Sequence, residues 1–122
     1  LRRTVASVKA TNDPAFGAAG ARLGEAVESL DHATTWLLGK LDKSPDAALA
    51  GATPYLRLFA SAAGGCMLAE DALAESRGGN GNGRVGLARF FAENVAVQAG
   101  GLETTITEGA ESVSDAALRG AA

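Results

Sequence analysis

Cysteine and histidine, which supply many of the metal ligands and nucleophiles in proteins, occur only once each in this chain, as Cys66 and His32. A single cysteine excludes an internal disulfide, and a single histidine excludes the paired Glu-x-x-His motifs of a di-iron bundle. Cys66 lies in an apolar stretch, where a free cysteine packs as a small hydrophobic residue. His32 is expected at the surface or at an interface. The sequence therefore offers no catalytic, cofactor-binding or metal-binding set.

Long apolar runs, basic clusters and alternating strand patterns are missing as well. No window approaches the run of about eighteen apolar residues that a membrane span requires. The net charge is −3, with both signs mixed along the chain, which argues against nucleic acid as a partner. Because a signal peptide is also absent, the expected location is cytoplasmic. Alanine and glycine are common and β-branched residues are sparse, so the fold is expected to be all-α.

What the chain does contain is helical periodicity in three long stretches, 14–41, 45–76 and 85–114. The first two begin with an acidic or hydroxyl residue followed by proline, as helices commonly do. The first and third stripes are Phe16, Gly20, Leu23, Val27, Leu30, Thr34, Leu37 and Leu41, and Val85, Ala88, Ala92, Val95, Ala99, Leu102, Ile106, Gly109 and Val113. Short connections at 42–44 and in the glycine-rich segment 78–83 predict an antiparallel up-down-up bundle.

The three helical stretches and their connections give the expected domain organisation. Residues 1–12 are less clearly patterned and are expected to be a linker or a short fourth element. Residues 13–114 form the bundle domain, and residues 115–122 are a tail expected to fray. The chain begins without methionine, and we expect it to be a piece of a larger protein.

The stretch 53–74 is expected to be the spine of the bundle, in contact on more than one side. Its predicted core stripe is Leu49, Ala52, Leu56, Phe59, Ala63, Cys66 and Leu73, with Tyr55, Leu58, Ala62, Met67 and Leu68 beside it. Gly64 and Gly65 lie at its centre, and a glycine inside a helix costs about 1 kcal/mol relative to alanine. Close approach of a neighbouring helix is expected to offset that cost. Pro54 predicts a kink near 51–53.

Folding the chain at its two turns predicts which residues meet. Trp36 is expected to bury its ring near Ala52 and Tyr55. Glu70 interrupts the central stripe almost opposite Arg89, which predicts an ion pair between helices.

The two arginines next to the apolar stripes have an alternative role. Either Arg57 or Arg89 would then meet a partner domain or an anionic ligand instead.

Apolar residues are also more numerous than three helices can bury against one another. The surplus includes Leu38, Leu58, Leu68, Phe90 and Val97. Large exposed apolar patches mark contacts with partners. The isolated domain is therefore expected to associate with itself, most simply as a two-fold dimer.

Five blocks of sequence, in order, resemble a known family. They are ATTWLL at 33–38, ATPYLRLF at 52–59, GG at 64–65, ARFFAE at 88–93 and TEGAES at 107–112. The blocks are similar to the C-terminal accessory domain of acyl-CoA dehydrogenases, in the branch that resembles 3-methylmercaptopropionyl-CoA dehydrogenase. The residues expected to pack the family motif are Trp36, Tyr55, Phe59, Gly64, Gly65, Phe90 and Phe91. Cys66 and Val97 depart from the family, which usually has tryptophan and proline there.

The resemblance implies a helical domain appended to a flavin enzyme that introduces an α,β double bond into an acyl-CoA thioester. In such enzymes the catalytic glutamate and the FAD contacts belong to preceding domains, so no residue here inherits them. The implied partners are the catalytic domains of the same chain and further copies of it. The domain would help assembly or cover the substrate entrance. The alternative is a free-standing helical interaction module, and the length of the reading frame before Leu1 separates the two.

Overall fold

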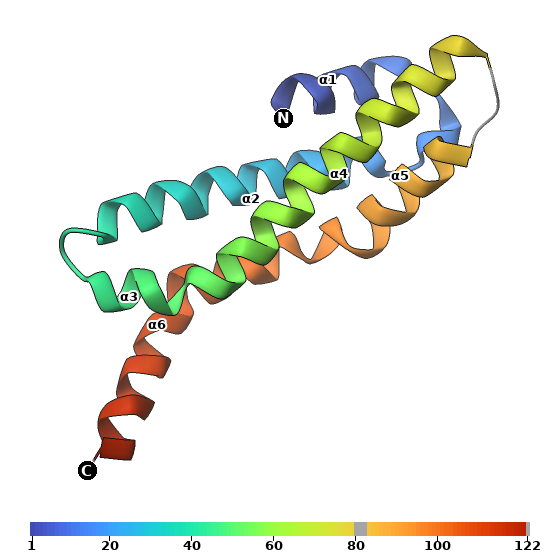
Figure 1. Ribbon diagram of the computed structural model, residues 1–122. Coiled ribbons are helices and arrows are strands. Elements are labelled where there is room, and N and C mark those ends of the chain that lie inside the picture. The colour runs from blue at the N-terminus through green and yellow to red at the C-terminus, as the bar shows by residue number, and fades with distance from the viewer. Residues whose placement is uncertain (80–82, 122) are drawn as a thin grey trace.

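The computed structural model describes the backbone of residues 1–79 and 83–121, with side chains up to residue 109 and at residue 112. This part of the chain contains no strand, which confirms the all-α expectation. Its helices are α1 (Arg2–Thr11), η1 (Pro14–Phe16), α2 (Ala19–Lys40), α3 (Pro45–Ala50), α4 (Ala52–Gly78), α5 (Gly83–Asn94), η2 (Ala96–Gln98) and α6 (Ala99–Ala121). Figure 1 shows that α2, the pair α3 and α4, and the pair α5 and α6 run in alternating directions. The structure differs from an uninterrupted three-helix bundle, because two of these segments are broken and α1 is added.

The first long helix begins later than the sequence predicts. The Asp13 carboxylate accepts a hydrogen bond from the Ala15 N–H at 2.9 Å, as the helix-start signal predicts. That signal produces only the 3₁₀ turn η1, because Gly17 has φ of 53° and redirects the chain. Helix α2 therefore starts at Ala19, and the five apolar or small positions of its predicted stripe from Phe16 to Leu30 are buried.

The expected kink near residues 51–53 is a break between two helices. Helix α3 ends at Ala50, and the Gly51 N–H donates to the Ala47 and Ala48 carbonyls. Pro54 then lies in the first turn of α4, where its missing N–H costs nothing. Gly51 is buried, and a Cβ there would lie 3.2 Å from Ile106 Cγ2 of α6. The sixth helix therefore closes over this break.

The third predicted helix is also interrupted, at residues 95–98. Asn94 Nδ2 donates to the Phe90 carbonyl at 2.9 Å, and Gln98 Nε2 donates to the Asn94 carbonyl at 3.2 Å. Side-chain amides that bond to nearby carbonyls compete with the helical backbone pattern. The helix resumes as α6 and extends beyond the predicted end near residue 114, because the alanine-rich end has high helix propensity. The side chain of Val113 lies outside the described residues.

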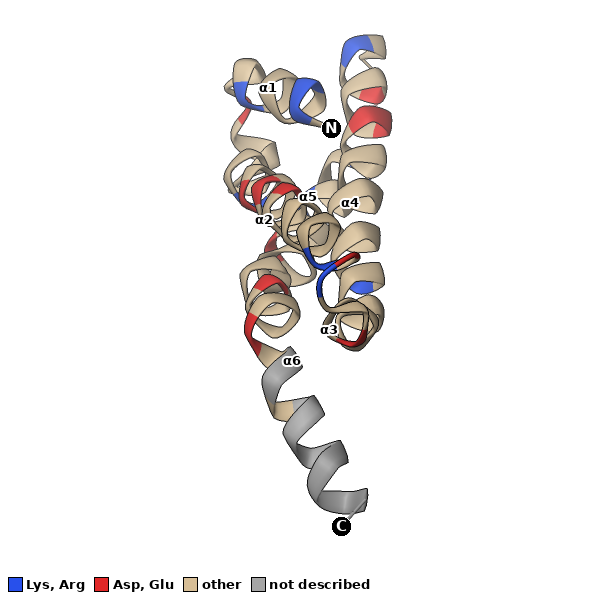
Figure 2. Ribbon diagram, turned by 90° about the vertical axis from the view of Figure 1, so that its left-hand side faces the viewer, with Lys and Arg blue, Asp and Glu red and all other residues tan. Residues whose placement is uncertain are grey.

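Residues 1–12, expected to be a linker or a short element, include the ten-residue helix α1, which packs on α2 and α4. Val5 and Val8 are buried in the common core. Arg2 forms ion pairs of 3.2 Å with Glu28 and with Asp31 on α2. Figure 2 shows acidic and basic residues distributed over several helices rather than gathered on one. Half of the glycine-rich turn expected at 78–83, residues 80–82, lies outside the described part.

The predicted central stripe is buried only in part: Cys66 and Leu73 are buried as expected, but its positions before Ala63 are exposed. Leu49 is 72% exposed and Leu56 is 66% exposed, although both belong to the predicted stripe. The buried residues of α4 are Leu58, Ser61, Ala62, Gly65, Cys66, Ala69, Ala72 and Leu73. Small and apolar residues occur on several sides of α4, so its packing against α2, α5 and α6 decides which side is buried. Burial raises the pKa of the Cys66 thiol, as expected for a packed cysteine.

Trp36 is only partly buried, and Lys40 Nζ lies 5.6 Å from the centre of its ring. The residue of α2 that reaches Tyr55 is Thr34, whose Oγ1 lies 2.8 Å from the Tyr55 hydroxyl. The predicted pairing of 34–36 with 52–55 is therefore close, but Tyr55 is hydrogen-bonded to Thr34. We expect Trp36→Ala to reduce the free energy of unfolding by about 1–2 kcal/mol, less than the 3–5 kcal/mol typical of a buried tryptophan. Urea unfolding would measure this, and a loss above about 3 kcal/mol would contradict the partial exposure.

Candidate interaction surfaces

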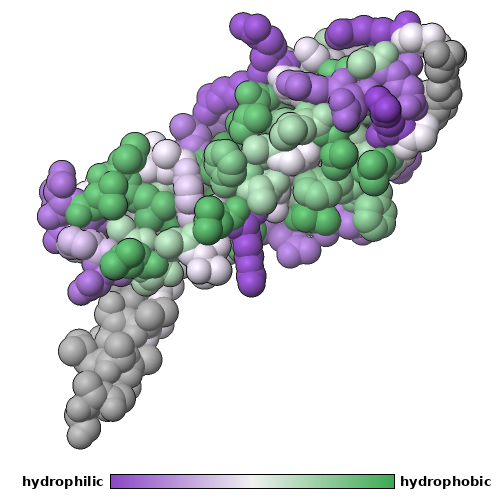
Figure 3. Space-filling model, in the orientation of Figure 1, coloured by the Kyte–Doolittle hydropathy of each residue, from purple (hydrophilic) through white to green (hydrophobic). Residues whose placement is uncertain are grey.

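Four exposed leucines gather where α2, α3 and α4 meet. We call this surface the apolar end, and it consists of Leu38, Leu41, Leu49 and Leu56. The leucines surround a groove of about 610 Å³, and Thr34 and Tyr55 are among the other residues that line it. Figure 3 shows the hydrophobic residues over α3 and the adjoining ends of α2 and α4. Exposed leucines this close together are typical of a surface that a partner covers.

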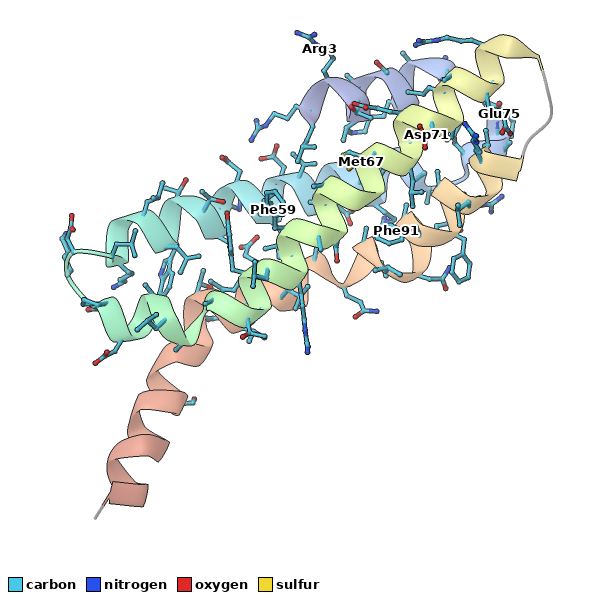
Figure 4. The ribbon with its side chains drawn as sticks, in the orientation of Figure 1. Arg3, Phe59, Met67, Asp71, Glu75 and Phe91 are labelled. Atoms are coloured by element: carbon cyan, nitrogen blue, oxygen red, sulfur yellow. The ribbon has the colours of Figure 1, made fainter. Side chains whose placement is uncertain are left out.

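A second groove of about 730 Å³ runs along the outer side of α4. We call it the α4 groove, and its α4 wall consists of Arg57, Ala60, Ser61, Gly64, Met67, Leu68 and Asp71. Phe91, Val95 and Leu102 form the opposite wall, from α5, the η2 region and α6. Figure 4 shows Met67 and Asp71 along α4, and Phe91 from the neighbouring α5. The two grooves occupy different stretches of α4. On this helix the apolar end reaches Leu56, and the α4 groove begins at Arg57.

The ion pair predicted between Glu70 and Arg89 is wrong. Glu70 Oε1 accepts a hydrogen bond of 2.8 Å from the Thr4 hydroxyl on α1. Arg89 Nε instead lies 3.2 Å from Glu93 Oε1, four residues along its own helix. The Thr4 partner was not predicted because α1 had no assigned position, whereas Arg89 and Glu93 have the i,i+4 spacing of a pair within one helix. Arg57 is exposed at the edge of the α4 groove, so its role as a contact for a partner stays a prediction.

Glu93 joins two helices through a backbone contact that the sequence did not predict. Its Oε1 accepts a hydrogen bond of 2.9 Å from the Ala18 N–H, at the start of α2. This bond, together with the hydrogen bond and the charge of Arg89, lowers the pKa of the Glu93 carboxyl. Carboxylates are favourable at helix N-termini because free N–H groups and the helix dipole point at them.

We expect Glu93→Gln to destabilise the chain at neutral pH and to have less effect in acid. Because the pKa of Glu93 is lower in the folded state than in the unfolded state, its stabilisation is present above about pH 4. It disappears as the pH falls through the folded-state pKa. Urea unfolding of both proteins at pH 7 and pH 3 would measure this. A difference between them that stays the same at both values would contradict a charged Glu93 in this role.

His32 is exposed, with Nδ1 3.6 Å from Glu103 Oε1 on α6. Among the residues expected to pack the family motif, Gly65 is buried and Phe91 is partly buried against the core. Phe59 and Phe90 are exposed, so they add little to the core of this chain. Within the described side chains, no three His, Cys, Asp or Glu residues gather as metal ligands.

A family model described as acetyl-CoA dehydrogenase C-terminal like matches residues 2–117. No curated protein and no solved structure matches the chain. No helix within the described residues has enough length and apolar character to cross a bilayer. Since the match spans nearly the whole sequence, the chain belongs to the acetyl-CoA dehydrogenase C-terminal-like family and is a helical accessory domain.

Proposed function

We propose that this chain is the accessory domain of an FAD-dependent acyl-CoA dehydrogenase in the branch resembling 3-methylmercaptopropionyl-CoA dehydrogenase. The observation that carries the proposal, besides the family match, is the apolar end. Its four leucines lie on three helices and cover no core of this chain. We assign the catalytic domains of the same polypeptide to this surface. The flavin and the catalytic base belong to those domains, and the assembled enzyme acts in the cytoplasm.

Burial of the apolar end would supply a large part of the docking energy. Covering a leucine side chain contributes about 1.5–3 kcal/mol relative to leaving it in water. Four such residues are enough to position a domain, even after the cost of ordering the contact is subtracted. Docked in this way, the domain would help assemble the enzyme or cover its substrate entrance.

The proposal is tested on the complete product of the reading frame that contains residue 1. We expect a yellow flavoprotein that oxidises acyl-CoA thioesters, and a colourless, inactive product from the 122-residue chain alone. A colourless full-length protein, or a reading frame that starts directly before Leu1, would overturn the assignment. The second result would favour a free-standing interaction module.

A triple leucine-to-serine variant tests whether the apolar end is the docking surface. Leu38→Ser with Leu49→Ser and Leu56→Ser is expected to lower the thermal midpoint of the full-length enzyme by several degrees. The same three changes should leave the midpoint of the isolated chain nearly unchanged, because all three residues are exposed there. Leu87→Ser on α5 is the matched control, being exposed but distant in sequence from the apolar end. If the control and the triple variant behave alike in the full-length enzyme, the apolar end is not the docking surface.

A further inference from the structure

Gly64 and Gly65 are neighbours in α4, but their surroundings differ. A Cβ at Gly65 would lie 2.5 Å from Leu23 Cδ2, so packing inside the chain requires glycine there. A Cβ at Gly64 would meet only Phe91 Cζ, at the ordinary contact distance of 3.8 Å. Glycine inside a helix costs about 1 kcal/mol relative to alanine. Within the described part of the chain, nothing packs closely enough at Gly64 to offset that cost, which points to a contact with another molecule.

Charged residues are placed symmetrically about Gly64 in the α4 groove. Arg57 lies seven residues before it and Asp71 seven residues after it, and all three line the groove. Seven residues are close to two helical turns, so the three positions share one side of α4. The two charges are each about 10 Å from Gly64 along the helix axis. Neither forms an ion pair with any residue that the structure describes.

A surface with opposite charges at equal distances from its centre is complementary to itself in the antiparallel direction. When two copies of α4 cross antiparallel at Gly64, Arg57 of each copy faces Asp71 of the other. A two-fold interface brings together the same patch of both copies, so a single symmetric arrangement forms both ion pairs. A parallel pairing would instead place like charges together.

The side chains between the charges fit a helix as the occupant. Ala60 and Gly64 are small, which lets the backbone of a second helix approach closely. Met67 is 67% exposed, and its flexible side chain adapts to an apposed surface. Phe91 and Val95 form the apolar far wall of the groove. Charged rims around an apolar centre are the usual anatomy of a protein interface.

We propose that two copies of this chain associate through their α4 grooves, as an antiparallel α4 pair with its two-fold axis at Gly64. This inference goes beyond the proposed function and gives an interface to the further copies of the chain that the family resemblance implies. It uses a surface other than the apolar end, so the domain can dock on its own catalytic body and pair with a second copy at once.

Charge exchange tests the pairing. We expect sedimentation of the 122-residue chain to show a dimer. Either Arg57→Glu or Asp71→Arg alone should weaken dimerisation tenfold or more, because each single change places like charges together at both contacts. The double variant should dimerise again. A 1:1 mixture of the two single variants should form a heterodimer, since its contacts are again opposite in charge. Arg77→Glu, an exposed change at the end of α4, is the control and should leave dimerisation unchanged.

Several outcomes would overturn the inference. They are a monomeric wild-type chain, single charge variants that dimerise like wild type, or a double variant that stays monomeric. Loss of the dimer in the triple serine variant of the apolar end, with no loss in the charge variants, would place the interface there instead. All of these can be distinguished from failure of the proposed function, because none of them depends on flavin or on acyl-CoA oxidation.

Gly64→Ala tests the close approach separately. We expect it to raise the thermal midpoint of dilute monomer, because alanine favours the helix and its Cβ meets only an ordinary contact. At the same time it should weaken dimerisation severalfold, since two added methyl groups face each other across the axis. Gly39→Ala on α2 is the matched control, because a Cβ there meets nothing within 4 Å. It should raise the midpoint without affecting dimerisation, and equal dimerisation of both variants would contradict the crossing at Gly64.

Discussion

Leu58→Ala is expected to reduce the free energy of unfolding by about 3 kcal/mol, within the usual range for a buried leucine. Leu58 is fully buried in α4 and belongs to the central core. Removing its side chain loses hydrophobic burial and leaves a cavity that the surrounding helices fill only partly. Urea unfolding of the isolated chain would measure the loss.

Leu56→Ala is the matched control for this experiment. Leu56 lies two residues away and is 66% exposed, so its loss should change stability by less than about 0.5 kcal/mol. The periodicity of the sequence gives the opposite order, because it places Leu56 in the stripe and Leu58 beside it. If Leu56→Ala proves the more costly change, α4 does not bury Leu58 and expose Leu56 as the structure has them.

Gly65→Val is expected to destabilise the chain by about 3 kcal/mol, at the upper end of the cost of overpacking. The new side chain would enter the space of Leu23 on α2 and of the Phe91 ring on α5. Leu23 is fully buried, so it has no free volume into which it can move. The effect reaches two helices because α4 lies between them.

Gly64→Val controls for helix propensity in this comparison. It makes the same change one residue away, so the intrinsic helical cost of valine is identical in both variants. Its side chain would enter the open α4 groove rather than the core. Thermal unfolding of dilute protein should show a lower midpoint for Gly65→Val than for Gly64→Val. Equal midpoints would mean that α4 does not pack against α2 and α5 at this level.

The periodicity of the sequence predicted the helices well wherever one helix was continuous. Leu23, Val27 and Leu30 are buried as the first stripe predicts, and Val85 and Ile106 are buried as the third stripe predicts. These faces follow from local spacing, because residues three and four apart lie on one side of a helix.

Backbone breaks were harder to predict, because they depend on single residues whose effect is decided by distant contacts. Gly17 reverses the sign of φ at a point where the start signal predicts a helix. The buried Gly51 separates α3 from α4, where the sequence predicts a single kinked helix. Glycine occurs throughout this sequence, so composition alone does not mark which glycines interrupt a helix.

The polar contacts depended on long-range placement in the same way. Glu93 binds the Ala18 N–H, 75 residues away in sequence, and Glu70 binds Thr4, 66 residues away. Neither contact leaves a periodic signal. Of the four leucines of the apolar end, only Leu38 belongs to the predicted surplus. The other three were predicted to lie in core stripes, and they are exposed because packing with the neighbouring helices buries other residues.

Thiol labelling at the apolar end tests the central claim most directly. Leu49→Cys places a reactive group on the most exposed leucine of that surface, while the native Cys66 is buried and should not react. We expect the Leu49→Cys thiol to react quickly in the isolated chain and at least tenfold more slowly in the full-length protein. Ser76→Cys, at an exposed position near the end of α4, should react equally in both. Equal labelling of Leu49→Cys in the two proteins would contradict docking of the domain through its apolar end.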